Sequence, residues 1–174
     1  MSSSQTLAAV DVGYPPDGGA IAALVATDDP GFGSITEEHV VRVHVVEHYR
    51  SGAFYERELP AIQAVLAASG PVDLLIIDGY VDLDPSGRPG LGSHAHEALG
   101  LPIIGVAKSA FRSATHAIPV LRGRSTRPLY ITAAGLEPST AATLVRDMTG
   151  AHRLPDALRR VDQLTRAGNA RGTS

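Results

Sequence analysis

The chain has 174 residues, of which 44% are hydrophobic and 19% are charged, and its formal net charge is −3. This composition excludes a disordered chain and suits one domain with a buried core. A chain that is not basic overall needs a local Lys and Arg cluster to contact nucleic acid, and without cysteine it has no disulfides or thiolate metal sites. The sequence shows no membrane-spanning apolar run and no signal-peptide pattern. We therefore expect a monomeric, cytoplasmic domain over 1–174, with frayed tails at about 1–5 and 168–174 and no membrane partner.

Three strands are expected in the first third of the chain, over residues 6–14, 20–27 and 37–48. Turns rich in proline, glycine and aspartate separate them at 15–19 and 28–34. The third strand alternates apolar and polar residues with a period of two, which is typical of a strand with one solvated face. Short turns between successive strands predict an antiparallel meander.

Helices alternate with strands in the rest of the chain. Residues 72–78 and 101–108 are short and uniformly apolar, which predicts buried parallel strands. A further strand or extended segment is expected over 127–133, and the irregular segment 109–126 is expected to be a loop. Helices are predicted over 58–70, 93–99, 138–150 and 154–168. This order predicts an α/β fold with one mixed sheet, an antiparallel three-strand meander followed by parallel β-α-β units, flanked by helices.

The stretch LLIIDGY, residues 74–80, ends an aliphatic run in Asp78 and a glycine. An ionised carboxylate beside a core is costly unless something pairs with it. Asp78 alone is readily interpreted as a turn residue, but Asp11 lies inside an apolar strand, where that interpretation is weaker. If the two strands are neighbours, their carboxylates face each other, and a divalent cation such as Mg²⁺ would relieve the repulsion. Glu58 and Asp162 could join this site. The alternative for Glu58 is a favourable charge at a helix N-terminus, and the alternative for Asp162 is a solvated acid on a helix.

Five stretches of the sequence carry recognisable motifs. They are DVGY at 11–14, YRSGAFYERELP at 49–60, LLIIDGY at 74–80, GLGSHAHEALGLPIIGVAKS at 90–109 and RLPDALRRVD at 153–162. DVGY resembles the DVSY of the endonuclease V family, and the other four resemble further motifs of that family, in family order and at compatible spacing. The resemblance runs from about residue 7 to residue 167 and implies a metal-dependent nuclease with an RNase H-like fold that acts on deaminated nucleic acid.

The resemblance implies a catalytic set and a cofactor. Asp11 and Asp78 match metal-binding aspartates, and Asp162 matches an acidic or histidine position that helps to hold metal and water. Glu58 matches the catalytic glutamate. Lys108 matches a lysine near the scissile phosphate. The implied cofactor is Mg²⁺, with Mn²⁺ as the other candidate, and the implied partner is DNA or RNA that carries deoxyinosine or inosine.

The resemblance also implies substrate-binding residues. Tyr49 matches a wedge tyrosine that helps to separate the strands around the lesion, and the backbone of Gly52 and Gly79 would line the base pocket. Arg57, Tyr80 and His94 complete the substrate-binding set. Tyr80 follows Asp78 closely and either lines the base pocket or simply packs, and His94 either faces a phosphate or has a structural role.

A basic cluster, LRGRSTR, and a pair of histidines lie outside these assignments. The cluster is either a solvated loop or a phosphate contact, and beside a nuclease site we assign Arg122 and Arg124 to substrate binding. His94 and His96 are two residues apart on a predicted helix, so they point apart and predict no joint zinc site.

Two departures from the family pattern bear on lesion recognition. The wedge, normally Pro-Tyr-x-Pro, is here HYRS at 48–51, and Asp84 stands where the family has an active-site histidine. A second hypothesis is therefore a nucleic-acid-binding module of the same fold with lost or altered cleavage. A third is an RNase H-like nuclease for branched or single-stranded nucleic acid. The sequence does not choose between DNA and RNA.

Overall fold

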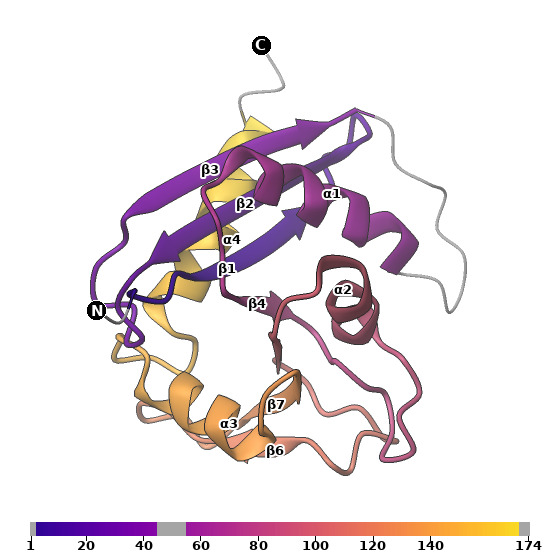
Figure 1. Cartoon of the computed structure of the whole chain (residues 1–174), viewed down its shortest axis with the longest axis vertical. Coiled ribbons are helices and arrows are strands. Elements are labelled where there is room, and N and C mark those ends of the chain that lie inside the picture. The colour runs from indigo at the N-terminus through magenta and orange to yellow at the C-terminus, as the bar shows by residue number, and fades with distance from the viewer. Residues whose placement is uncertain (1–2, 45–54, 171–174) are drawn as a thin grey trace.

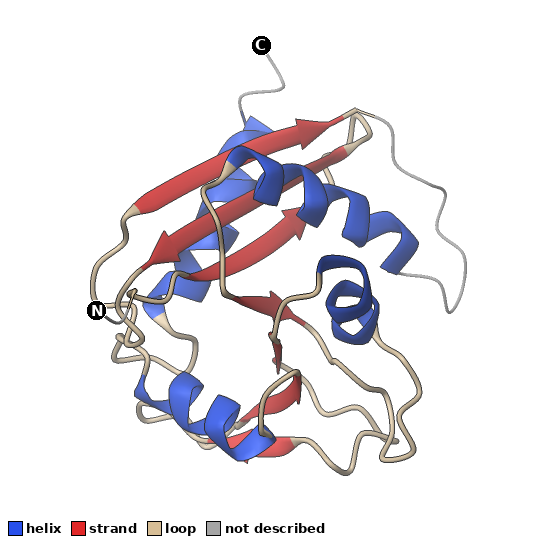
Figure 2. Cartoon of the chain, viewed as in Figure 1, coloured by secondary structure: helices blue, strands red, loops and turns tan. Residues whose placement is uncertain are grey.

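The computed structural model describes residues 3–44 and 55–170, and a seven-stranded mixed sheet runs through it (Figures 1 and 2). The strand order across the sheet is β3-β2-β1-β4-β5-β7-β6. The strands are β1 (Leu7–Gly13), β2 (Ala20–Thr27), β3 (Glu37–Val43), β4 (Leu74–Asp78), β5 (Ile103–Ala107), β6 (Ile118–Val120) and β7 (Leu129–Ala134). The helices are α1 (Tyr55–Ala68), α2 (Leu91–Leu99), α3 (Pro138–Asp147) and α4 (Asp156–Ala170).

The pairing confirms the expected mixed sheet. β1, β2 and β3 form an antiparallel meander, and β1 then pairs in parallel with β4, which pairs in parallel with β5. β7 and β6 close the far side of the sheet as antiparallel neighbours of β5 and of each other. β2 is buried along its whole length because it lies between two strands and has helices over both faces.

Two apolar cores lie on opposite faces of the sheet, because successive residues of a strand point to opposite sides. One core contains the buried residues of α3 and α4, and the other contains those of α1 and α2. In Figure 2 the helices lie accordingly on both sides of the red strands. Within the described ranges, no helix combines the length and the apolar character that a membrane span requires.

The structure corrects three expectations about individual elements. The segment expected as a loop contains β6, a three-residue edge strand with Pro119 at its centre. A proline is tolerated at an edge because its missing N–H faces away from the only neighbour, and a strand this short leaves no periodic signal. Helix α1 begins at Tyr55 rather than residue 58, so Pro60 lies inside the helix and removes one backbone hydrogen bond. At the other end of the chain, α4 continues to Ala170, into the range expected as a tail.

Candidate active site

Three neighbouring strand ends carry the charged side chains that the sequence singles out. β1 and β4 pair with Leu7 opposite Leu74, and continuing that register by two residues beyond its last pair places Asp11 opposite Asp78. Lys108 follows β5 directly, two residues after Val106, which pairs with Asp78. The period of two then directs all three side chains to the face of the sheet that α4 covers.

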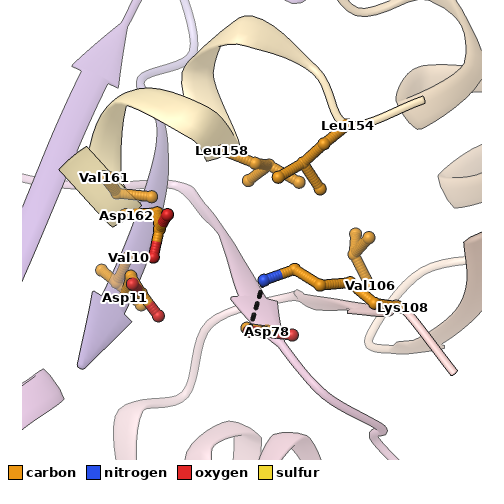
Figure 3. A pocket seen from close by; sticks show the side chains of 9 residues that line it. All are labelled: Val10, Asp11, Asp78, Val106, Lys108, Leu154, Leu158, Val161 and Asp162. Atoms are coloured by element: carbon orange, nitrogen blue, oxygen red, sulfur yellow. Dashed lines mark hydrogen bonds and ion pairs between the residues drawn. The ribbon is translucent and has the colours of Figure 1, made fainter. Parts of the chain in front are cut away.

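Asp162 joins these residues from α4. Its side chain lines the same pocket as Asp11, Asp78 and Lys108, and apolar residues of β1, β5 and the α4 region form the other wall (Figure 3). The pocket is lined by Val10, Asp11, Asp78, Val106, Lys108, Leu154, Leu158, Val161 and Asp162. The apolar wall excludes water on one side, so charges in the pocket interact more strongly than they would on an open surface.

Each aspartate of the pocket has a partner within the protein. Nζ of Lys108 lies 3.2 Å from Oδ2 of Asp78, and Nε of Arg166 lies 3.2 Å from Oδ2 of Asp162. The hydroxyl of Thr165 lies 3.3 Å from Oδ2 of Asp11. Within residues 3–44 and 55–170, no group of three or more His, Asp or Glu side chains is arranged to hold a metal ion as it stands. The three aspartates expected as ligands therefore share a pocket without forming a closed cluster.

Glu58, on α1, is not among the residues that line this pocket, but the charges of the same carboxylates act on it. Burial, followed by the charges of Asp78 and Asp11, raises the pKa of Glu58 to about 8. Burial and then the charge of Asp78 also raise the pKa of Asp11, with Lys108 acting in the opposite direction. Burial and neighbouring negative charge thus both disfavour the ionised forms of Glu58 and Asp11 in the absence of a cation.

Arg57 lies against an aromatic ring at the edge of the acidic cluster. Its guanidinium carbon is 4.0 Å from the centroid of the Tyr14 ring, a cation–π contact. The Tyr14 hydroxyl and Nε of Arg57 are both buried without a hydrogen-bond partner in the described part of the chain. The sequence analysis predicted substrate binding for Arg57 but not its contact with Tyr14. Tyr14 lies 43 positions earlier, and only the fold brings the two residues together.

The turn after Asp78 is held from two sides. Gly79 has φ of +125°, which only glycine adopts readily, and its N–H donates to the carbonyl of Val106 at 3.0 Å. The Tyr80 hydroxyl donates to the Ser109 carbonyl at 2.7 Å and accepts from the N–H of Phe111 at 3.0 Å. The Tyr80 hydroxyl therefore ties this turn to the loop after Lys108, and the expectation that Tyr80 binds substrate stays a prediction.

The side chains of His94 and Asp84 both contact other residues of the protein. The His94 ring stacks on Tyr55, with ring centroids 3.5 Å apart. The Asp84 carboxylate accepts from the N–H and hydroxyl of Ser86 and from the N–H of Arg88. Asp84 therefore closes its own surface loop and does not take over the part of the histidine that the family has at this position.

Arg122 does not reach the site, which corrects its assignment to substrate binding. Only 6% of the residue is exposed. Its guanidinium donates to the main-chain carbonyls of Arg146, Met148, Gly150, His152 and Arg153. These carbonyls belong to the C-terminal end of α3 and to the following segment, where helix carbonyls lack partners. Arg122 therefore holds this segment in place and has no donor left for a phosphate.

Arg153 has a role at the site that the sequence did not predict. Its guanidinium donates to the carbonyls of Lys108, Arg127 and Pro128, so it fastens the segment before α4 to the residue that follows β5 and to the residues just before β7. Arg153 is the first residue of the RLPD motif, so the sequence did indicate this position. Its place in a motif does not show which groups its side chain contacts. Arg124 lies exposed in the loop before β7. Tyr49 and Gly52 fall outside the described residues.

Comparison with known proteins gives one consistent family. A family model described as Endonuclease V matches residues 1–130. Endonuclease V of Streptomyces coelicolor is 33% identical over 183 residues, which cover 91% of this chain and 76% of that protein. The solved structure of endonuclease V from Streptomyces avermitilis has a TM-score of 0.82 at 28% identity, covering 98% of this chain and 84% of that chain.

A second solved structure has the same fold. Endonuclease V of Ciona intestinalis, solved with a 23-mer DNA that contains an inosine followed by a ribo-adenosine, has a TM-score of 0.82 at 19% identity, covering 96% of this chain and 86% of that chain. A meander feeding parallel strands, with acidic residues at the strand ends, is the arrangement of an RNase H-like nuclease. Since the family model covers most of the chain, the chain belongs to the endonuclease V family, whose name describes a nuclease hydrolase.

Proposed function

We propose that this protein is a Mg²⁺- or Mn²⁺-dependent endonuclease that hydrolyses phosphodiester bonds near deoxyinosine or inosine. The observation that supports it best is the convergence of Asp11, Asp78 and Lys108 from three adjacent strand ends on one pocket. Membership of the family supports the reaction, and the inosine-containing DNA bound by the Ciona relative supports the substrate class. A cytoplasmic location and a monomeric state stay predictions.

The donor set fits a divalent cation. Asp11 and Asp78 offer carboxylate oxygens, which Mg²⁺ prefers, and Mg²⁺ commonly takes one or two carboxylates together with waters and phosphate oxygens. The raised pKa values of Asp11 and Glu58 indicate a site that lacks positive charge. Asp11 and Asp78 would hold the cation, and Asp162 would contribute once it separates from Arg166. Such a cation, when bound, lowers the pKa of a water and offsets negative charge on the phosphate.

The residues of the chain itself supply positioning and proton transfer. Lys108 would leave Asp78 for the scissile phosphate and stabilise the negative charge that develops there. Glu58 would accept the proton of the attacking water, because its pKa of about 8 lies near the pH at which a general base works best. Arg57, stacked on Tyr14, would offer its guanidinium to a flanking phosphate.

A binding module with lost cleavage is the second candidate, and one observation favours it. The Asp84 carboxylate is bonded into its own loop, so nothing at this position replaces the family's histidine. Such a module would bind nucleic acid as well after loss of Asp78 as before. The pocket residues Asp11, Asp78 and Lys108 are all retained, which supports the enzyme over the module.

A cleavage assay tests the proposal. Labelled DNA and RNA strands, each with one inosine or none, would be incubated with Mg²⁺, Mn²⁺ or a chelator. The variant Asp78→Asn removes a proposed ligand, and Asp28→Asn, at an exposed position away from the pocket, is the matched control. Cation-dependent cutting that requires inosine and is lost only in Asp78→Asn is expected. Binding without cutting by all three proteins would favour the module, and cutting that ignores inosine would reject the substrate.

A further inference from the structure

One half of the sheet is built from a stretch of sequence without acidic residues. Residues 98–136 contain no Asp or Glu, and they form β5, β6, β7 and their loops. The span carries a formal charge of +5, so the rest of the chain, within a total of −3, carries −8. A protein that is acidic overall therefore has a strongly basic segment, and this segment contains Lys108. The basic residues of the span are Lys108, Arg112, Arg122, Arg124 and Arg127.

Three of these residues, Arg112, Arg124 and Arg127, are called the loop arginines below. All three are exposed, and none makes a side-chain hydrogen bond or an ion pair with any residue in the described part of the chain. Six other arginines of the described chain lie within 4.0 Å of a carboxylate, whereas Arg57 contacts an aromatic ring and Arg153 contacts main-chain carbonyls. Those pairs are Arg42–Asp17, Arg88–Asp84, Arg146–Asp147, Arg159–Asp156, Arg160–Glu38 and Arg166–Asp162. A guanidinium without a carboxylate neighbour keeps its full charge for an external anion.

The loop arginines lie at the same end of the sheet as the pocket. β7 runs antiparallel to β5 with Ala107 opposite Tyr130, so the chain just before β7 lies beside Lys108. Arg153 fixes this closeness, because its guanidinium donates to the carbonyls of both Lys108 and Arg127.

The other two loop arginines are attached to the same region. Arg124 lies in the turn that precedes Arg127, and the Ser125 hydroxyl accepts from the N–H of Arg127 at 3.1 Å. Arg112 follows Phe111, whose N–H donates to the hydroxyl of Tyr80, two residues after Asp78. Both loops therefore leave the sheet next to the residues proposed to cut the phosphodiester bond.

We propose that the three loop arginines bind backbone phosphates of the nucleic acid on one side of the cleavage position, and so carry most of the electrostatic affinity for the substrate. The inference rests on the proposed function for the identity of its partner. Unpaired arginines attract phosphate by releasing condensed counterions. The acidic remainder of the molecule repels the same strand. The two effects together direct the bound strand along the β5–β7–β6 side of the pocket.

Salt-dependent binding without cleavage tests this surface. The triple variant Arg112→Gln, Arg124→Gln, Arg127→Gln would be compared with Arg42→Gln, Arg146→Gln, Arg159→Gln, which loses the same charge from paired arginines. The dissociation constant for an inosine-containing DNA strand and its duplex would be measured by fluorescence anisotropy in chelator, between 0.05 and about 1 M KCl. The chelator prevents cleavage, so the outcome does not depend on catalysis.

The loop variant is expected to lower the slope of log affinity against log salt by about 2 to 3, since each phosphate contact contributes about 0.7 to 0.9. Its binding should weaken on the order of 100-fold at 0.1 M salt, and the proteins should converge near 1 M. The control triple should change the slope by less than about one. Each single loop substitution should lower the slope by about one, and these variants stand in if the triple does not fold.

Three results would overturn the inference. An equal loss of affinity in the two triple variants would mean that net charge alone governs binding and that the loop arginines contribute no more than other arginines. An unchanged slope in the loop variant, with wild-type binding intact, would place the nucleic acid elsewhere while leaving the proposed function standing. If the wild-type protein binds no DNA or RNA at all, the surface and the proposed function both fail.

Discussion

The guanidinium of Arg153 donates a hydrogen bond to the main-chain carbonyl of Lys108, and through it the segment before α4 holds the residue that follows β5. The same guanidinium donates to the carbonyls of Arg127 and Pro128. Arg122 in turn donates to the carbonyls of His152 and Arg153. Arg122 therefore holds the segment that contains Arg153, and Arg153 in turn holds the backbone of Lys108.

Replacing Arg153 should impair turnover more than binding. Arg153→Ala frees the Lys108 backbone, and a misplacement of about 1 Å costs about 100-fold in well-oriented reactions. We expect kcat to fall about 10- to 100-fold and KM to change less than about threefold, because Arg153 would not touch the substrate. Steady-state kinetics on an inosine strand gives both constants. Added guanidinium ion should restore part of the lost kcat, which a general loss of stability would not permit.

Lys108 can be followed without any catalytic assay, because it is the only lysine in the chain. Its ammonium is held at 3.2 Å from Asp78 in the intact protein. Acylation by an amine-specific reagent, quantified by mass spectrometry against the N-terminal amine, should be faster in Arg153→Ala. Equal acylation rates and an unchanged kcat would show that Arg153 does not position Lys108. This readout remains informative even if the protein cuts none of the substrates tested.

Replacing Arg122 should destabilise the fold. Arg122→Met keeps an apolar stem but leaves several carbonyls at the end of α3 and beyond it without a donor. Unsatisfied buried groups cost about 1 to 3 kcal/mol each, less where water enters, so we expect a loss of roughly 2–4 kcal/mol. Urea unfolding followed by circular dichroism measures it. The exposed neighbour Arg124→Met is the control, expected within about 0.5 kcal/mol of wild type; an equal effect in the two variants would contradict the buried role.

The strand ends could be predicted from the sequence because two local patterns agree there. A run of aliphatic residues that ends in a carboxylate identifies a buried strand and a polar terminus together, as in the stretch that leads to Asp78. The period of two then fixes which side chains share a face. The motif resemblance added Lys108 and Glu58. Lys108 lines the same pocket as Asp11 and Asp78, and the charges of these two aspartates act on Glu58.

The arginines show what the sequence could not provide. LRGRSTR has no periodicity, so nothing local tells that Arg122 turns inward while Arg124 stays exposed. The difference comes from partners 24 to 31 positions away, whose carbonyls only the fold assembles. The same holds for Tyr80, whose hydroxyl bonds to main-chain groups 29 and 31 positions away that no local pattern indicates.

Substituting Gly105 should disturb the site through the backbone. A Cβ at this position would lie 2.5 Å from the carbonyl oxygen of Gly79 and 2.7 Å from Oγ1 of Thr132. That hydroxyl oxygen accepts from the N–H of Val81 at 2.9 Å, so the turn after Asp78 must move. Gly105→Ala should cost roughly 1–3 kcal/mol in unfolding free energy and lower kcat. Gly31→Ala, where a Cβ meets only ordinary contacts, is the control for thermal unfolding and kinetics; equal effects would show that the close approach is unimportant.

The ionisation of Glu58 should reduce the stability of the cation-free protein as pH rises. Its folded pKa is about 8, against about 4.5 for the unfolded chain. A carboxyl with a raised folded pKa leaves the fold fully stable below about pH 4.5, and stability is lost progressively as pH rises through 8. Glu58→Gln stays neutral, so in chelator it should exceed wild type by on the order of 2–4 kcal/mol at pH 8.5 and by little at pH 4.5.

Urea titrations of both proteins from pH 4.5 to 9 measure this difference, with Glu56→Gln in the same helical turn as control. Mg²⁺ should reduce it, because a cation held by Asp11 and Asp78 offsets the charge that makes the ionised Glu58 costly. A difference that does not grow with pH would mean that Glu58 is not buried among charged neighbours. A difference that grows with pH but ignores Mg²⁺ and Mn²⁺ would separate the carboxylate cluster from the proposed cation site, and would favour the binding module over the enzyme.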